Sequence, residues 1–417
     1  MSFATRVVLS VGVAAMGVPW AWTRYAASAA RMPAAASAMM VNRAPAQGAS
    51  PAAVTVREIR AAVPGFEPHR MRYDPTSRRF VSTLRDGTRA TLTLEPSWQR
   101  ATQSLMARYQ MPRASVVVLD TDTGRVLVYA SYGGAGRDLA LSPEPPAASV
   151  FKIVTSSALL QHGFNERDTT CWSGGFHALT ARELVSDPRR DRECSTLADA
   201  FAHSTNTVFA RRALEFLRPD TELAAAQAWG FGSPVPFDAP VPESAVTVPA
   251  ETLAFARTAA GFWNSHLSPL HGALLAQGIA RRGEMLRPYL IDHLDTARGQ
   301  RLANGVTQVW QRAVPEAVAA GLGRAMLRTV SDGTGHHGFH DDAGRAYLPD
   351  VVVGGKTGTL NGRTPDSQYT WFVGNAEGPS RRLSFAVMVA NGPVWRVKAP
   401  TLARQVLQIA YRGRPSD

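Results

Sequence analysis

Apolar and polar residues alternate along several short stretches near both ends of the chain. Residues 78–95 alternate on either side of Asp86-Gly87, and residues 114–132 alternate around a Thr-Gly pair, so each stretch predicts a β-hairpin. Three more strands with short connections are predicted near the C-terminus, over residues 350–360, 367–376 and 383–392.

Apolar residues recur at helical spacing in other segments. This spacing predicts helices over 96–111, 147–161 and 400–411, and a helical, loop-rich region follows the second of them to about residue 285. Strands at both ends with helices between them predict an α+β fold. We expect an antiparallel sheet of N- and C-terminal strands flanked by helices, with an all-helical lobe.

The composition is that of a globular protein long enough for one large or two moderate domains. Of the 417 residues, 45% are hydrophobic and 19% are charged. The net charge is +12, but the arginines are spread along the chain without a basic run. This spread argues against a dedicated nucleic-acid surface, and we predict no nucleic-acid partner.

The N-terminal part of the chain predicts export. Residues 1–25 contain an apolar stretch directly after a basic residue, which is typical of a signal peptide or a short membrane anchor. Residues 26–58 are rich in alanine and predict a linker. We expect a small β-rich stub over 59–90 and the main domain over 91–417. An uncleaved anchor is the first interpretation and cleavage followed by secretion is the alternative.

Two cysteines, Cys171 and Cys194, lie within one segment of the chain. In an oxidising compartment they could pair and close a loop, and this is the first interpretation. Two free buried thiols are the alternative.

Lysine is rare in this chain, which makes its positions informative. Of 45 basic residues three are lysines, namely Lys152, Lys356 and Lys398. Arginine stays protonated in proteins, whereas a desolvated lysine can become a base. Lys152 follows Ser149 by three residues near the start of a predicted helix, so the two side chains share one face. The pair therefore predicts a serine nucleophile activated by a lysine.

A second lysine begins the segment Lys356-Thr357-Gly358 on a predicted strand. The glycine allows a ligand to lie against the strand, and the lysine and threonine suit a substrate carboxylate. A phosphate-binding loop is excluded because Asp350 stands where that motif needs glycine, and no helix follows.

Two weaker signals complete the candidate set. Ser204 and Asn206 lie at a junction between two predicted helices, where a helix-capping serine is the plainer interpretation. The histidines and aspartates of residues 336–342 do not match a closed zinc pattern, so we predict a polar loop and no metal or cofactor.

In this order, Ser149-x-x-Lys152, Ser204-x-Asn206 and Lys356-Thr357-Gly358 resemble the penicillin-binding and serine β-lactamase superfamily. Further segments that look like landmarks of a penicillin-binding transpeptidase domain are residues 91–131, 195–211, 330–335 and 370–376. The resemblance implies a monofunctional transpeptidase domain without a glycosyltransferase domain.

The resemblance also implies roles for the motif residues. Ser149 would attack the carbonyl of a D-Ala-D-Ala stem peptide, and Lys152 would accept its proton. Ser204 would relay a proton to the departing amine, and Asn206 would hold Lys152 and the substrate amide.

The third motif would bind the other end of the substrate. Lys356 and Thr357 would hold its terminal carboxylate, with Gly358 against the strand. Backbone N–H groups of Ser149 and Thr359 would form the oxyanion hole.

The resemblance leaves the exact activity open. A DD-transpeptidase is the first interpretation, and a DD-carboxypeptidase is the nearest alternative. A β-lactamase or β-lactam sensor would need a group that activates water, for which Glu243 is the nearest candidate. An inactive member that acts as an interaction protein is the last alternative. The implied partners are peptidoglycan stem peptides, β-lactams, other cell-wall synthesis proteins and the inner membrane, with the catalytic domain periplasmic.

Overall fold

The computed structural model describes residues 56–176, 178–362 and 368–412. Residues from Val54 to Asp417 form one compact unit. The predicted signal or anchor segment, and the predicted linker up to residue 55, lie outside the described residues. Within the described part of the chain, no helix combines the length and the apolar character needed to cross a membrane.

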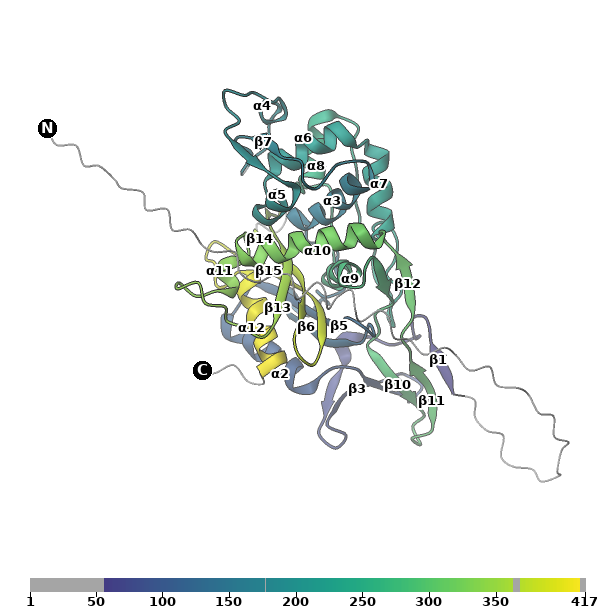
Figure 1. The fold of residues 1–417 in the computed structure, drawn as a ribbon. Coiled ribbons are helices and arrows are strands. Elements are labelled where there is room, and N and C mark those ends of the chain that lie inside the picture. The colour runs from purple at the N-terminus through teal and green to yellow at the C-terminus, as the bar shows by residue number, and fades with distance from the viewer. Residues whose placement is uncertain (1–55, 177, 363–367, 413–417) are drawn as a thin grey trace. The chain divides into compact units, whose positions relative to one another are not determined.

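A five-stranded antiparallel sheet forms the centre of this unit, with the order β13-β14-β15-β5-β6 (Figure 1). Both ends of the sequence contribute strands, as predicted, so the expected α+β class is confirmed. The strands are β5 (Arg113–Asp120), β6 (Val126–Gly133), β13 (Val352–Asn361), β14 (Gln368–Glu377) and β15 (Arg382–Asn391).

Helices cover both faces of this sheet. Along β14, Trp371 and Val373 belong to one hydrophobic core, whereas Phe372 belongs to the other, because successive side chains of a strand point to opposite faces. The helices against the first face are α9 (Pro269–Ala280) and α10 (Glu316–Ser331). Those associated with the second face are α2 (Pro96–Tyr109), α11 (His336–Phe339) and α12 (Ala399–Arg412).

The remaining helices form a lobe, and α10 runs between this lobe and the central sheet (Figure 1). A 3-10 turn, η4 (Ala148–Phe151), leads directly into the lobe's first helix. The helices are α3 (Lys152–Gln161), α4 (Ala181–Leu184), α5 (Leu197–His203), α6 (Asn206–Phe216), α7 (Pro219–Ala228) and α8 (Thr252–Ala259). The lobe also contains a short antiparallel pair, β7 (Thr170–Trp172) and β8 (Glu193–Ser195).

A second, six-stranded sheet has the order β1-β11-β10-β4-β3-β2. The predicted turn at Asp86-Gly87 joins β3 to β4, as expected. Two of the strands come from residues 291–305, which the sequence pattern did not predict as strands, and the boundary expected at residue 90 falls inside β4. The strands are β1 (Arg57–Ile59), β2 (Arg72–Asp74), β3 (Arg79–Thr83), β4 (Arg89–Leu92), β10 (Ile291–Asp295) and β11 (Arg301–Gly305).

A buried ion pair lies at the start of β10. Arg287 donates to Asp238 over 2.5 Å, and the second oxygen of Asp238 accepts the backbone N–H groups of Leu290 and Ile291. Arg287 follows β9 (Glu284–Leu286), which pairs with β12 (Val309–Arg312). The pair therefore fixes the connection between β9 and the six-stranded sheet.

Candidate active site

Ser149 lies in η4, one turn before α3, in a segment that its neighbours hold tightly. The indole N–H of Trp371 on β14 donates to the Pro146 carbonyl over 2.9 Å. Ala148 has a left-handed backbone with φ of 51°, an uncommon conformation for a residue with a side chain. Gly261 packs on this turn so closely that a Cβ atom there would lie 2.6 Å from the Ala148 carbonyl oxygen. The predicted nucleophile is thus positioned by the sheet and by the end of α8 together.

Lys152 is fully buried and its ammonium nitrogen meets three oxygens. Nζ lies 2.9 Å from Ser149 Oγ, 2.7 Å from Asn206 Oδ1 and 2.6 Å from the Ala260 carbonyl oxygen. The predicted contact between serine and lysine is therefore present, and Asn206 joins it from α6. The third partner could not be predicted from the sequence, because every residue has a backbone carbonyl.

The contacts of Lys152 fit a neutral amine as well as an ammonium group. The Asn206 amide nitrogen donates to the Gly175 carbonyl over 2.8 Å, so its Oδ1 faces Lys152 as an acceptor. An ammonium group donates to all three oxygens, whereas a neutral amine has two hydrogens and one lone pair. In the neutral form the two hydrogens go to Asn206 Oδ1 and the Ala260 carbonyl, and the lone pair accepts from the Ser149 hydroxyl. The contacts are thus compatible with a lysine that takes a proton from the serine.

Burial and charge favour the neutral form. Burial lowers the pKa of Lys152 well below its ordinary value, and the nearby positive charge of Lys356 lowers it further.

Lys356 itself is also fully buried, and burial lowers its pKa to about 7. Its Nζ donates to the Thr357 carbonyl over 3.0 Å and lies 5.4 Å from the centre of the Phe201 ring. Lys356 is not among the residues that line the cleft described below, and its Nζ lies on the side of α5 and Lys152. The hydroxyl of Thr357 does face the cleft and meets the hydroxyl of Thr334 at 2.5 Å.

Ser204 ends α5 in a left-handed conformation with φ of 58°. The N-cap position of α6 belongs to the next residue, Thr205, so Ser204 does not cap α6. Ser204 lines the same cleft as Ser149 and Asn206, and its hydroxyl has no hydrogen-bond partner among the described residues. The structure therefore brings both residues of the second motif to the first.

A cleft of about 510 Å³ opens over Ser149. Strand β13 lines the cleft on the side of the sheet, and it is an edge strand whose outer backbone groups are not paired by any described strand. A Cβ atom at Gly358 would lie 3.3 Å from Ala148 Cβ, so the glycine lets this strand approach the turn that carries Ser149. The residues of the predicted site that line the cleft are Ser149, Ser204, Asn206, Thr357, Gly358 and Thr359.

Other lining residues were not predicted as site residues. Thr334 lies in the segment 330–335, which was noted only as a landmark. Phe176 and Trp395 are exposed aromatic residues, and nothing in their local sequence indicates the cleft. Lys398, the third lysine, stands beside the cleft with its Nζ 5.3 Å from the centre of the Trp395 ring. The scarcity of lysine was a signal that could have identified it.

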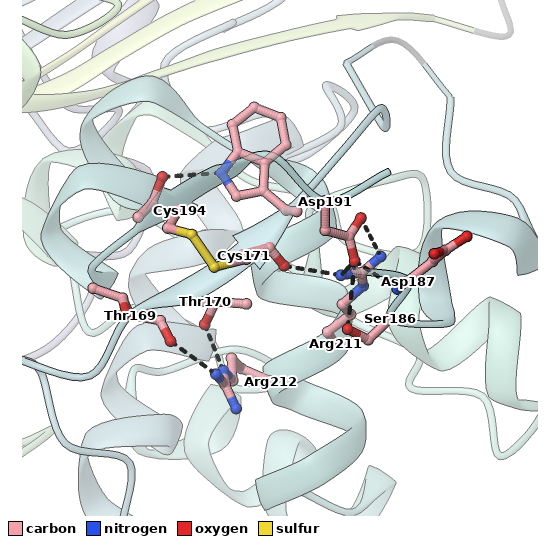
Figure 2. The surroundings of a disulfide bond; sticks show 11 residues. Thr169, Thr170, Cys171, Ser186, Asp187, Asp191, Cys194, Arg211 and Arg212 are labelled. Atoms are coloured by element: carbon pink, nitrogen blue, oxygen red, sulfur yellow. Dashed lines mark hydrogen bonds and ion pairs between the residues drawn. A yellow bond between two sulfur atoms is a disulfide. The ribbon is translucent and has the colours of Figure 1, made fainter. Parts of the chain in front are cut away.

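A disulfide between Cys171 and Cys194 closes the loop that carries Phe176 (Figure 2). Arg211 on α6 supports this loop, since it donates to the Cys171 carbonyl over 2.9 Å and to Asp191 over 2.6 Å. The hydrogen bond from Arg211 holds the pKa of Asp191 well below its usual range. Because Asn206 binds both the Gly175 carbonyl and Lys152, this loop is held in place beside Lys152.

Two other groups from the sequence analysis lie elsewhere. The His336 and His340 rings stack at 4.2 Å outside the cleft lining. Among the described residues, no group of three or more His, Cys, Asp or Glu side chains is placed to hold a metal ion. Glu243 is exposed and does not line the cleft, so it is not placed to activate water at Ser149.

Several known proteins are similar to this chain in sequence and fold. Residues 114–408 match the family model of the penicillin binding protein transpeptidase domain. Peptidoglycan D,D-transpeptidase PbpA of Mycobacterium tuberculosis is 28% identical over 369 residues, which cover 78% of this chain and 72% of that protein. The homologous PbpA of Mycolicibacterium smegmatis is 27% identical over 316 residues, covering 67% of this chain and 62% of that protein.

Solved structures of penicillin-binding proteins are also similar to this chain. The crystal structure of PBPA from M. tuberculosis has a TM-score of 0.66 at 25% identity, covering 78% of this chain and 83% of that one. The D,D-transpeptidase domain of a peptidoglycan glycosyltransferase from Eggerthella lenta has a TM-score of 0.64 at 27% identity, covering 79% and 84%. An imipenem acyl-enzyme complex of the M. tuberculosis protein is 26% identical with a TM-score of 0.65, covering 78% and 80%. The chain belongs to the penicillin-binding protein transpeptidase domain family.

Proposed function

We propose that this protein is a serine DD-transpeptidase that acts on D-Ala-D-Ala stem peptides of peptidoglycan through an acyl-enzyme, and that penicillins acylate the same serine. The placement of Lys152 carries the proposal, because its Nζ lies 2.9 Å from Ser149 Oγ and its burial favours the neutral form that can take the serine proton. The names of the relatives, and the acyl-enzyme complexes solved for one of them, support it.

In the proposed reaction, Lys152 takes the Ser149 proton while Oγ attacks the carbonyl carbon of the penultimate D-Ala. The backbone N–H groups of Ser149 and Thr359 stabilise the negative charge that develops on the carbonyl oxygen. Lys152 then gives up the proton that it took from Ser149, and Ser204 relays a proton to the departing D-Ala amine. The terminal carboxylate binds the hydroxyls of Thr357 and Thr334, with Lys356 next to Thr357 on the same strand.

The second half of the reaction transfers the acyl group to an amine of another stem peptide, which restores the Ser149 hydroxyl. A DD-carboxypeptidase would use water instead. The transpeptidase names of the relatives favour the amine. A β-lactamase needs a carboxylate or similar group that activates water, and no Asp or Glu is among the residues that line the cleft.

We further propose that the catalytic domain works outside the cytoplasm, tethered to the inner membrane by residues 1–25, beside other cell-wall synthesis proteins. The disulfide supports an oxidising compartment, since such bonds persist there. Secretion after cleavage stays the alternative for the N-terminal segment.

Intact-mass spectrometry of the purified full chain after brief exposure to benzylpenicillin tests the proposal. We expect the mass of one penicillin to be added and to persist for many minutes, and Ser149→Ala to gain none. Consumption of penicillin without a lasting adduct would instead identify a β-lactamase. The absence of both adduct and consumption would overturn the acyl-enzyme chemistry.

A further inference from the structure

Behind the catalytic lysine lies a buried carboxyl group that the proposed reaction does not use. Glu222 on α7 is fully buried, and one of its oxygens accepts from or donates to Thr155 Oγ1 at 2.5 Å. The other oxygen, Oε2, has no hydrogen-bond partner among the described residues. Thr155 lies on α3, three residues after Lys152, and so on the same helix face.

Thr155 connects this carboxyl group to the end of α8. Its Oγ1 also lies 2.9 Å from the carbonyl oxygen of Ala259, the last residue of α8. The carbonyl of the next residue, Ala260, accepts from Lys152 Nζ. Carbonyls at a helix C-terminus have no partner within the helix, so these two side chains of α3 satisfy two successive free carbonyls of α8.

The threonine hydroxyl has one hydrogen but faces two oxygens, and this count decides the form of Glu222. A carbonyl oxygen can only accept, so the Ala259 contact requires the hydrogen of Thr155. The Glu222 contact is then a hydrogen bond only if the carboxyl group is protonated and donates to Thr155 Oγ1. Only the neutral form of Glu222 allows both contacts of Thr155 to be hydrogen bonds.

We propose that Glu222, as a neutral acid, is a positioning residue for Lys152: it donates to Thr155, Thr155 holds the end of α8, and the Ala260 carbonyl there orients the lysine. When Glu222 ionises, its carboxylate competes for the Thr155 hydrogen and the Ala259 carbonyl loses its donor. The geometry of the general base then loosens.

The surroundings of Glu222 agree with this assignment. Burial raises the pKa of Glu222 to about 7, and the contact with Thr155 opposes the rise only in part. The titratable groups on the adjoining helices are Lys152 on α3, Arg257 on α8 and Asp220 on α7. None of them contributes to this pKa, and the Arg257 side chain donates to the Leu179 carbonyl instead.

The test compares the pH dependence of acylation in the full chain and its variants, using a fluorescent penicillin as the probe. Glu222→Gln keeps a donor for Thr155 but cannot ionise. We compare the acylation rate constant of the wild type, divided by that of the variant, across pH. We expect this ratio to fall about fivefold from pH 6 to pH 9, because ionised Glu222 costs the wild type one hydrogen bond. Taking this ratio removes the titration of Lys152, which both proteins share.

Two further variants keep the proposal testable if Glu222→Gln folds poorly. Thr155→Ser retains the hydroxyl and should keep the wild-type profile, whereas Thr155→Val should lower acylation at every pH and lose the alkaline decline. Asp138→Asn is the matched control, because Asp138 is a largely buried carboxyl that accepts from Tyr129 at 2.6 Å and does not line the cleft. It should leave the profile unchanged.

The proposal rests on the acylation chemistry proposed above, and the two can fail separately. A wild type that takes up no penicillin refutes the proposed function. A wild type that is acylated but has the same profile as Glu222→Gln refutes only the positioning role. The same refutation follows if Asp138→Asn shows the alkaline change, or if Thr155→Val is acylated as fast as the wild type.

Discussion

Replacing Asn206 with aspartate would place a carboxylate beside the amine of the catalytic lysine. The amide oxygen of Asn206 now lies 2.7 Å from Lys152 Nζ. An added negative charge at this distance attracts an ammonium group by about 6 kcal/mol at an effective dielectric constant of about 20. The burial of the carboxylate and the loss of the amide dipole offset about half of this, which leaves a rise of about 2 units in the pKa of Lys152.

A raised lysine pKa has a defined effect on the pH profile. The reaction needs neutral Lys152, so the acylation rate constant of Asn206→Asp should fall below that of the wild type, by up to about 100-fold at pH values below the lysine pKa of both proteins. The ratio of variant to wild type should then rise toward one as the pH increases, because the variant lysine also loses its proton. Stopped-flow measurement with a fluorescent penicillin gives this ratio.

Asn206→Ala is the matched control, because it removes the same amide without adding charge. It also removes the hydrogen bond to the Gly175 carbonyl, so a loss of rate from a loosened loop would appear in both variants. We expect its ratio to the wild type to be independent of pH. A deficit of Asn206→Asp that does not change with pH would refute the account of Lys152 as a neutral base.

Three other predictions concern stability. The disulfide joins two cysteines that are 23 residues apart in the sequence. Replacing both, by Cys171→Ser and Cys194→Ser, should lower the free energy of unfolding by about 3 kcal/mol. Urea denaturation of this variant and of the oxidised wild type measures the difference. Burial lowers the pKa of His271 to about 4, so the unfolded chain binds a proton that the folded chain excludes. Stability should therefore fall by about 3 kcal/mol as the pH drops from 6.5 to 4, and His271→Gln should flatten this slope. Gly355→Ala would place a Cβ atom 2.5 Å from Phe372 Cζ and should destabilise the fold by about 1–3 kcal/mol, seen as a lower Tm; an unchanged Tm would contradict the packing described for β13.

The local pattern of the sequence predicted most of the central sheet. Strands such as β5 and β15 are covered on both faces, and their apolar runs between turn residues stand out. The pattern did not predict β10 and β11, whose exposure is mixed and whose partners β1 and β4 lie about two hundred residues away. Pairing over such a separation depends on the whole fold, and short strands carry little signal of their own.

For the site, the sequence by itself determined which side chains are chemically capable of the reaction. The scarcity of lysine singled out Lys152 and Lys356, since arginine cannot act as a base. The tertiary structure decided the surroundings of these side chains: it buries Lys356 against Phe201, gives Lys152 the Ala260 carbonyl as a partner, and brings Thr334 and Glu222 to the site. Burial and backbone hydrogen bonds are properties of distant segments packed together, and those properties set the protonation of the lysine. No local pattern of residues can encode them.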